Sequence, residues 1–189
     1  LKPVEVIERG RIDRLWQIRH GASPVLARIA DGRRSLQVIE DGCVPPGRLA
    51  EYVVAVEAAC EISRQGVVAA QVAAVEIGIP AVVEGRLTHN DPAELQQAQM
   101  SVPFAVAMAL VLAPGRAWPP VLTLQDFERS LADGRVRELA RRTVCVLDPA
   151  IERATTTEYV PARVTVSLVG GRKFEHTVWL PPGSPQRPI

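Results

Sequence analysis

The segment 101–112 constrains the fold of this chain more than any other. From Val102 onward its residues are apolar on nearly all sides of a helix, and Pro103 stands in the first turn, where a helix accepts proline. Ser101 is a suitable N-cap, because its hydroxyl can accept a backbone N–H of the first turn. A helix without a polar face must be covered on most sides. The segment therefore predicts a buried central helix with other elements packed around it.

The rest of the chain alternates predicted strands and helices. Gly170-Gly171 predicts a tight hairpin between the last two strands. Thr123 and Asp126 predict a capping box at the start of a short helix. Together the elements predict an α+β fold, a mainly antiparallel sheet with helices packed on one face. Strands are predicted near 36–40, 71–79, 143–147, 162–169 and 172–180, main helices near 52–64 and 101–112, and shorter helices over 125–132 and 133–142.

Composition excludes several classes of protein. The chain has 189 residues, of which 47% are hydrophobic and 23% charged, and its net charge of +1 gives no basic excess for nucleic-acid binding. No apolar run reaches the length of a membrane span, and the N-terminus lacks a signal-peptide pattern. Cys43, Cys60 and Cys145 are widely spaced, which favours reduced thiols over a disulfide framework or zinc site. We expect a cytoplasmic protein, and, because the chain begins at Leu1, a fragment or processed product.

Several short motifs occur in a fixed order around the central helix. They are Ser101-Val102-Pro103-Phe104, then 123–127, 135–142, 148–149, 161–166 and 180–185. No single motif is specific, but the ordered set, over roughly residues 36–189, resembles the C-terminal half of the MmgE/PrpD family. That family includes 2-methylcitrate dehydratase, cis-aconitate decarboxylase and iminodisuccinate epimerase. The resemblance implies a small lid domain at 36–189, with 1–35 as an N-terminal extension or linker from a helical domain.

In the family, the lid closes over a larger all-helical domain that supplies much of the acid–base machinery, and the active site lies between the two. This chain carries no copy of that helical domain. The resemblance therefore implies a partner, which is a separate chain that resembles the family's N-terminal helical domain. The two chains would form a hetero-oligomer, and a dimer of heterodimers is one possible arrangement. A lid alone would expose the surface meant for its partner.

Polar residues of the family are replaced at the lid's substrate-facing positions. Aligned to the family pattern, Val44 stands for a lysine, Ala50 for an arginine, Val53 for a histidine, Gln99 for a second lysine and Phe104 for a tyrosine. Family substrates are di- and tricarboxylates, whose charges need Lys, Arg or His nearby. These replacements imply a less charged substrate, or a lid that has lost its catalytic share.

The resemblance places substrate-binding residues at two junctions that lead into helices. Arg48 is the nearby cation that can still hold an anion, and Tyr52, Gln99, Ser101 and Phe104 would shape the pocket. The catalytic residues of this chain stay unknown, and acid–base work would fall to the missing domain. Two functions remain open. The first is a subunit of a lyase, isomerase or cyclase that acts in a secondary or biosynthetic pathway, and the second is a non-catalytic structural or regulatory partner of such an enzyme.

Other polar residues have simpler interpretations. His20 has no ligand-type neighbour and is read as a surface or capping residue. His89 heads an Asn-Asp-Pro turn, which turn chemistry explains better than an active-site trio. His176 is assigned to the exposed face of the last strand. The arginines of 133–142 suggest a phosphate site, but their spread around the helix favours a solvated face. No metal, nucleotide or other cofactor is implied, because ligand spacings and glycine-rich phosphate loops are absent from the sequence.

Overall fold

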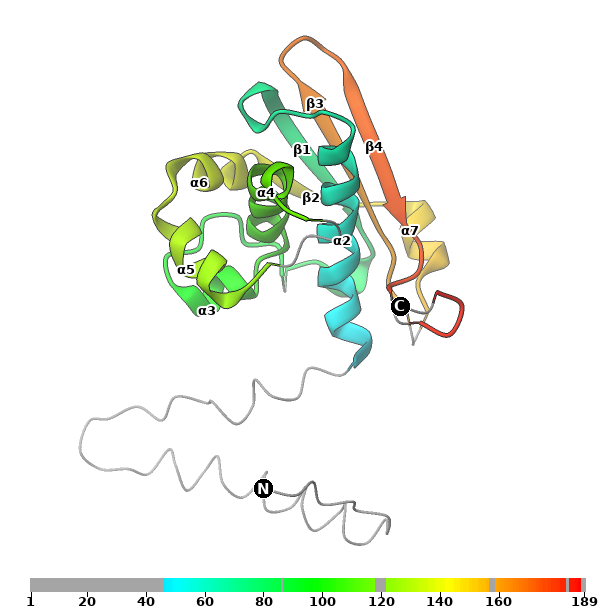
Figure 1. The fold of residues 1–189 in the computed structure, drawn as a ribbon. Helices are drawn as coiled ribbons and strands as arrows, with labels where there is room; N and C mark the ends of the chain where they lie inside the picture. Colours follow the sequence, from blue (N-terminus) through cyan, green and yellow to red (C-terminus); the bar gives the residue numbers. More distant parts are fainter. Residues whose placement is uncertain (1–45, 86, 118–121, 157–158, 183, 188–189) are drawn as a thin grey trace, which may run out of the picture. The chain divides into compact units, whose positions relative to one another are not determined.

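A four-stranded mixed sheet forms the base of the fold in a computed structural model of the chain (Figure 1). The structure describes residues 46–85, 87–117, 122–156, 159–182 and 184–187, with side chains from residue 53 onward. These residues belong to one unit, Pro45–Ile189. The predicted strand at 36–40 and His20 lie outside the described residues. The strands are β1 (Val72–Ile79), β2 (Thr143–Leu147), β3 (Ala162–Leu168) and β4 (Lys173–Val178), in the order β2-β1-β3-β4.

Helices cover one face of this sheet, as the α+β prediction requires. Helix α2 lies on β3 and β4, while α4 packs between α2 and α6 and reaches β2 (Figure 1). The helices are α2 (Pro46–Arg64), α3 (Leu95–Gln99), α4 (Val102–Leu112), α5 (Leu124–Ala132), α6 (Gly134–Arg141) and α7 (Pro149–Ala154), with short 3-10 turns at Ala69–Gln71, Ala81–Val83 and Ala113–Gly115.

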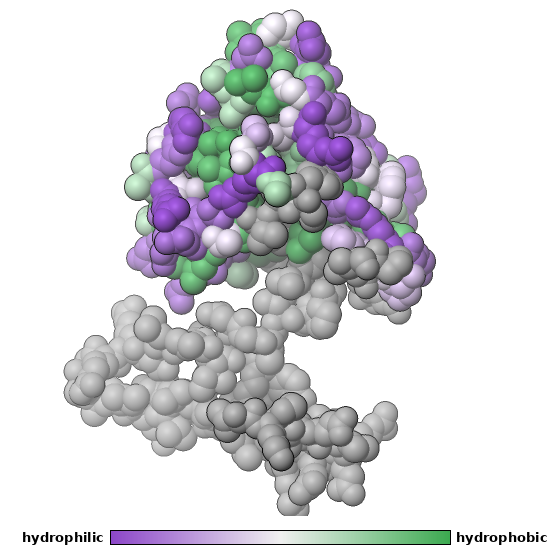
Figure 2. All heavy atoms as spheres, in the orientation of Figure 1, coloured by the Kyte–Doolittle hydropathy of each residue, from purple (hydrophilic) through white to green (hydrophobic). Residues whose placement is uncertain are grey.

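Helix α4 is the buried centre that its sequence predicts. Every residue from Val102 to Leu110 is buried, and the surrounding core takes side chains from α2, the sheet and α6. Burying apolar side chains is the main favourable contribution to folding, so this helix anchors the unit. Hydrophilic side chains cover much of the face shown in Figure 2, with smaller apolar patches among them. None of the described helices combines the length and apolar character that a bilayer span requires.

The sheet is mostly antiparallel, with one exception. Strand β3 pairs antiparallel with both β1 and β4, but β1 and β2 run parallel. A parallel neighbour needs a crossover connection, and the segment with α3, α4, α5 and α6 supplies it. The predicted hairpin is confirmed: Gly171 has a φ of 80°, which glycine adopts readily, and the Leu168 N–H donates to the Arg172 carbonyl at 2.8 Å.

Candidate functional site

The start of α4 is tied to the loop that precedes α3. The Ser101 side chain is fully buried; its Oγ accepts the N–H of Phe104 at 3.0 Å and donates to the carbonyl of His89. The Val102 N–H donates to the Leu87 carbonyl at 2.9 Å. The predicted N-cap is therefore confirmed, and its hydroxyl serves two backbone groups at once.

The other two predicted site residues of this junction lie in opposite environments. Gln99, at the end of α3, is exposed to solvent, as is its neighbour Met100. Phe104 is fully buried, and its ring centroid lies 6.3 Å from that of Phe127 in a tilted packing. The surface at the start of α4 thus presents an amide and a thioether, while the aromatic ring belongs to the core.

Arg48 and Tyr52 lie in the first part of α2, where the structure describes the backbone but not the side chains. Val44 lies outside the described residues. Helix α4 contacts both α2, which carries Arg48 and Tyr52, and α3, which carries Gln99. That the side chains of the five predicted residues contact a substrate stays a prediction.

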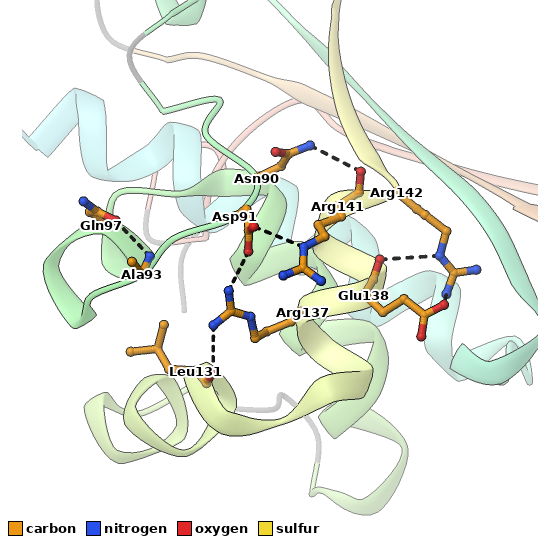
Figure 3. A network of polar contacts seen from close by, with 9 residues as sticks. All are labelled: Asn90, Asp91, Ala93, Gln97, Leu131, Arg137, Glu138, Arg141 and Arg142. Carbon is orange, nitrogen blue, oxygen red and sulfur yellow. Dashed lines mark hydrogen bonds and ion pairs between the residues drawn. The ribbon is translucent and has the colours of Figure 1, made fainter.

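A polar network holds the loop before α3 against α6 (Figure 3). Asp91 receives Arg137 Nη2 at 2.8 Å on Oδ1 and Arg141 Nε at 3.1 Å on Oδ2, and the Asn90 amide donates to the Arg141 carbonyl at 3.3 Å. The hydrogen bond from Arg141, helped by that from Arg137, lowers the pKa of Asp91. The prediction that the arginines of this helix do not converge is wrong for these two, because residues four apart lie on one helical face.

Asn90 and Asp91, which the sequence assigned to a turn rather than to an active-site trio, have structural partners. Asn90 and Asp91 fasten the loop, and its carbonyls at Leu87 and His89 receive the first turn of α4. The His89 side chain is exposed. The network thus positions the start of α4, next to Gln99.

A second ion pair supports the core beneath α4. Arg116 donates Nη1 to Asp126 Oδ2 at 2.9 Å and Nη2 to Oδ1 at 2.5 Å, a bidentate arrangement. The Thr123 backbone N–H donates to Asp126 Oδ2 at 2.8 Å, which completes the predicted capping box of α5. The Arg116 guanidinium, followed by the bonds from Thr123, holds the pKa of Asp126 well below its usual range. This pair fixes α5, which carries Phe127 against Phe104.

Comparison with known proteins decides the family. The family model described as MmgE/PrpD C-terminal domain matches residues 52–189, which include nearly the whole described fold. The chain belongs to the MmgE/PrpD family. A second model, FAD linked oxidases, C-terminal domain, matches residues 6–78, less than half of the chain and mostly outside the described residues. No curated protein matches the chain.

The MmgE/PrpD C-terminal domain also has a shallow hollow of about 400 Å³ between α2 and β4. His176 pairs with Val164, so its side chain lies on the helix-covered face, and the assignment to the exposed face is wrong. The alternation in β4 already contained the correct assignment, because His176 shares one face with Phe174 and Val178, while Lys173, Glu175 and Thr177 form the other. The residues lining the hollow are Glu57, Glu61, His176, Thr177, Val178, Trp179, Leu180 and Arg187.

The charged side chains that line this hollow form ion pairs within the chain. Arg187 binds Glu57 through both Nη atoms, with Nη1 2.9 Å from Oε2, and also donates to the Leu180 carbonyl at 3.1 Å. Glu61 binds Arg64 at 3.1 Å. Arg187 therefore fastens the C-terminal segment to α2, and both carboxylates that line the hollow, those of Glu57 and Glu61, are already paired.

The two described thiols of the MmgE/PrpD domain are held in the protonated form. Burial raises the pKa of the Cys60 thiol to about 12, with Glu57 and Glu61 adding to the effect, and burial raises that of Cys145 to about 12. Thiols with such pKa values carry almost no thiolate at neutral pH. The described residues contain no cluster of three or more His, Cys, Asp or Glu side chains that could hold a metal ion.

Proposed function

We propose that this MmgE/PrpD C-terminal domain is the lid of a lyase, isomerase or cyclase whose active site is completed by a family-type helical domain on a separate chain. The substrate carries fewer charges than the family's di- and tricarboxylates, and the reaction belongs to a secondary or biosynthetic pathway. Gln99 is the observation that carries this proposal, because it presents an exposed neutral amide beside the α4 start, where the family pattern has lysine.

Electrostatics supports a substrate of low charge. A carboxylate that leaves water needs charge-assisted hydrogen bonds in return. The nearby Arg137 and Arg141 are both bound to Asp91, so that cluster carries one excess positive charge rather than two. Phe104 is enclosed by the core and brings no hydroxyl to the surface. A neutral or singly charged ligand fits this environment better than a tricarboxylate.

The partner is tested first by isolating the chain from its native host and weighing the intact complex by mass spectrometry. We expect a helical-domain polypeptide in equal copy number with this chain. Recovery of this chain without such a polypeptide would contradict the split-enzyme proposal.

The charge preference is tested in the recovered complex by titrating citrate as a tricarboxylate probe. Gln99→Lys restores the family charge at an exposed position, so citrate should bind about 10-fold more tightly, since one charge-assisted hydrogen bond is worth roughly 1.5 kcal/mol or more. Gln96→Lys is the matched control, because Gln96 is also exposed on α3. Equal citrate affinity in the two variants would argue that position 99 does not face the substrate.

A non-catalytic partner subunit is the second candidate, and one observation favours it. Ser101 and Phe104, two of the five predicted substrate-binding residues, are engaged in a helix cap and in the core. Under this alternative, Gln99→Ala would leave kcat and KM of the recovered complex unchanged, whereas a lid that binds substrate would show a raised KM.

A further inference from the structure

Met100 is a large apolar side chain exposed at the junction between α3 and α4. The chain contains two methionines. Met108, inside α4, is fully buried, whereas Met100 directly follows α3 and is 54% exposed. The surface that Met100 leaves in solvent adds nothing to the hydrophobic core, since only buried apolar area stabilises the fold. That surface is therefore available to contact another molecule.

The backbone that carries Met100 is fixed by hydrogen bonds on both sides. The Met100 N–H donates to the Gln96 and Gln97 carbonyls, both at 3.2 Å, and the Ser101 N–H donates to the Ala98 carbonyl at 3.2 Å. The main chain at this point has little freedom left to lose when a ligand binds, which favours affinity. The side chain itself stays adaptable, because a thioether is unbranched and polarisable. Met100 is thus a flexible apolar group on a rigid support.

The surroundings of Met100 are uncharged. The sequence has no charged residue from 95 to 115, and the exposed neighbour Gln99 is neutral. Helix α5, which packs against α3, begins with Leu124, which is 53% exposed. A carboxylate placed against Met100 would lose hydration without receiving a cation from this segment. An apolar group would gain from the contact, and an aromatic ring would gain most, because a thioether also attracts the edge of a ring.

We propose that Met100 is a specificity-determining residue that packs on an aromatic ring of the substrate, while the Gln99 amide binds a neutral carbonyl or carboxamide group beside that ring. This inference rests on the proposed function, because it takes the α3–α4 junction as a surface that faces the substrate. It adds the aromatic part of the substrate, which the replacement of the family lysine by Gln99 does not by itself require.

Two amides that differ in one ring test the role of Met100 in the complex with the helical-domain polypeptide. Benzamide carries an aromatic ring on a neutral amide, and acetamide carries the same amide without the ring. Met100→Gln keeps the length of the side chain but removes its apolar end, so benzamide should bind about 5-fold more weakly and acetamide equally well. Met100→Leu stays apolar and should bind benzamide within about 2-fold of the wild type.

Val169→Gln is the matched control, because Val169 is 77% exposed in the turn after β3, and it should leave both affinities unchanged. NMR of methionine methyl groups labelled with ¹³C shows whether the contact is direct. The signal that disappears in Met100→Leu belongs to Met100. In the wild-type complex, benzamide should shift this signal more than acetamide does, and it should leave the signal of the buried Met108 in place.

The proposal is overturned if the wild-type complex does not bind benzamide, if Met100→Gln binds it as tightly as the wild type, or if the Met100 signal does not move. Loss of the helical-domain polypeptide from Met100→Gln would make Met100 an interface residue and would also overturn it. Gln99→Ala separates this inference from the proposed function. If Gln99→Ala weakens both amides while Met100→Gln weakens neither, the proposed function stands and the inference falls. If neither variant changes either affinity, both fall.

Discussion

Asp148 occupies the space that a side chain at Gly78 would need. A Cβ built on Gly78 would lie 2.8 Å from Asp148 Oδ2 and 3.0 Å from Asp148 Cβ. Asp148 cannot easily move away, because it accepts the Ala150 N–H at 2.8 Å as the N-cap of α7 and binds Arg163 Nη1 at 2.9 Å. The glycine in β1 and the carboxylate after β2 therefore depend on each other.

Gly78→Ala should lower the free energy of unfolding by about 1–3 kcal/mol, as overpacking does. Chemical denaturation followed by circular dichroism measures the change. Gly134→Ala is the control: no atom lies within 4 Å of its added Cβ, and it stands in α6, where alanine is favoured. A Gly78→Ala variant as stable as Gly134→Ala would show that Asp148 yields without cost.

Ser101→Ala should destabilise the fold by about 1–3 kcal/mol, because it leaves the Phe104 N–H and the His89 carbonyl without their buried partner. Thermal unfolding gives the measurement. Ser63→Ala is a matched control, since the Ser63 hydroxyl is buried without a hydrogen-bond partner and its removal should be nearly neutral. A neutral Ser101→Ala would contradict the capping role.

Acid should weaken the fold partly through Asp126. Arg116 lowers the folded-state pKa of Asp126. The ionised Asp126 therefore contributes its full stabilisation above the unfolded-state pKa of about 3.9, and that contribution is lost as the pH falls from there through the folded-state pKa. Asp126→Asn should therefore be less stable at neutral pH, and its stability should fall less between pH 4 and pH 2. Urea denaturation at a series of pH values tests this.

The control for Asp126 is Glu138→Gln, which changes an exposed carboxylate 3.4 Å from Arg142. Exposed pairs contribute little, so its stability and pH profile should match those of the wild type. Identical acid profiles for the wild type and Asp126→Asn would refute the role of Asp126.

Asp91→Asn should loosen the loop that receives α4. The variant weakens the bonds from Arg137 and Arg141, so the Val102 amide, which donates to Leu87, should exchange its hydrogen faster. Hydrogen exchange read by mass spectrometry gives the rate for peptides over 87–105. Glu94→Gln, a nearby exposed acid, should leave that rate unchanged.

Cys60 should resist alkylation in the folded protein. Burial raises its thiol pKa to about 12, so iodoacetamide should modify it slowly at neutral pH and rapidly after denaturation. A Cys43→Ser, Cys145→Ser chain isolates its signal, and Val169→Cys in the same chain supplies an exposed reference thiol. Equal labelling rates at the two thiols would contradict the burial of Cys60.

Periodicity and turn chemistry predicted much of the fold. The apolar run of α4, the capping box of Thr123 and Asp126, and the Gly171 hairpin depend on neighbours in sequence, so the sequence alone reveals them. The parallel pairing of β1 and β2 could not be predicted in that way, because it is decided by packing between distant segments.

The candidate site was less predictable for the same reason. The exposure of Gln99 and the enclosure of Phe104 depend on which elements surround α4. Asp91 meets Arg137 and Arg141 from 46 or more residues away, and no local pattern indicates that meeting. The face of His176, by contrast, was within reach of the sequence, because His176 alternates with Phe174 and Val178 on the apolar side of β4.

The parallel pairing of β1 and β2 ties the candidate site to the centre of the fold. The chain leaves the sheet after Ile79 and returns at Thr143 to the adjacent strand. The crossover between these points carries Gln99, Ser101 and the Asp91 network together with α4, the buried centre of the core. A variant that weakens the packing of α4 should therefore disturb the candidate site and the sheet together.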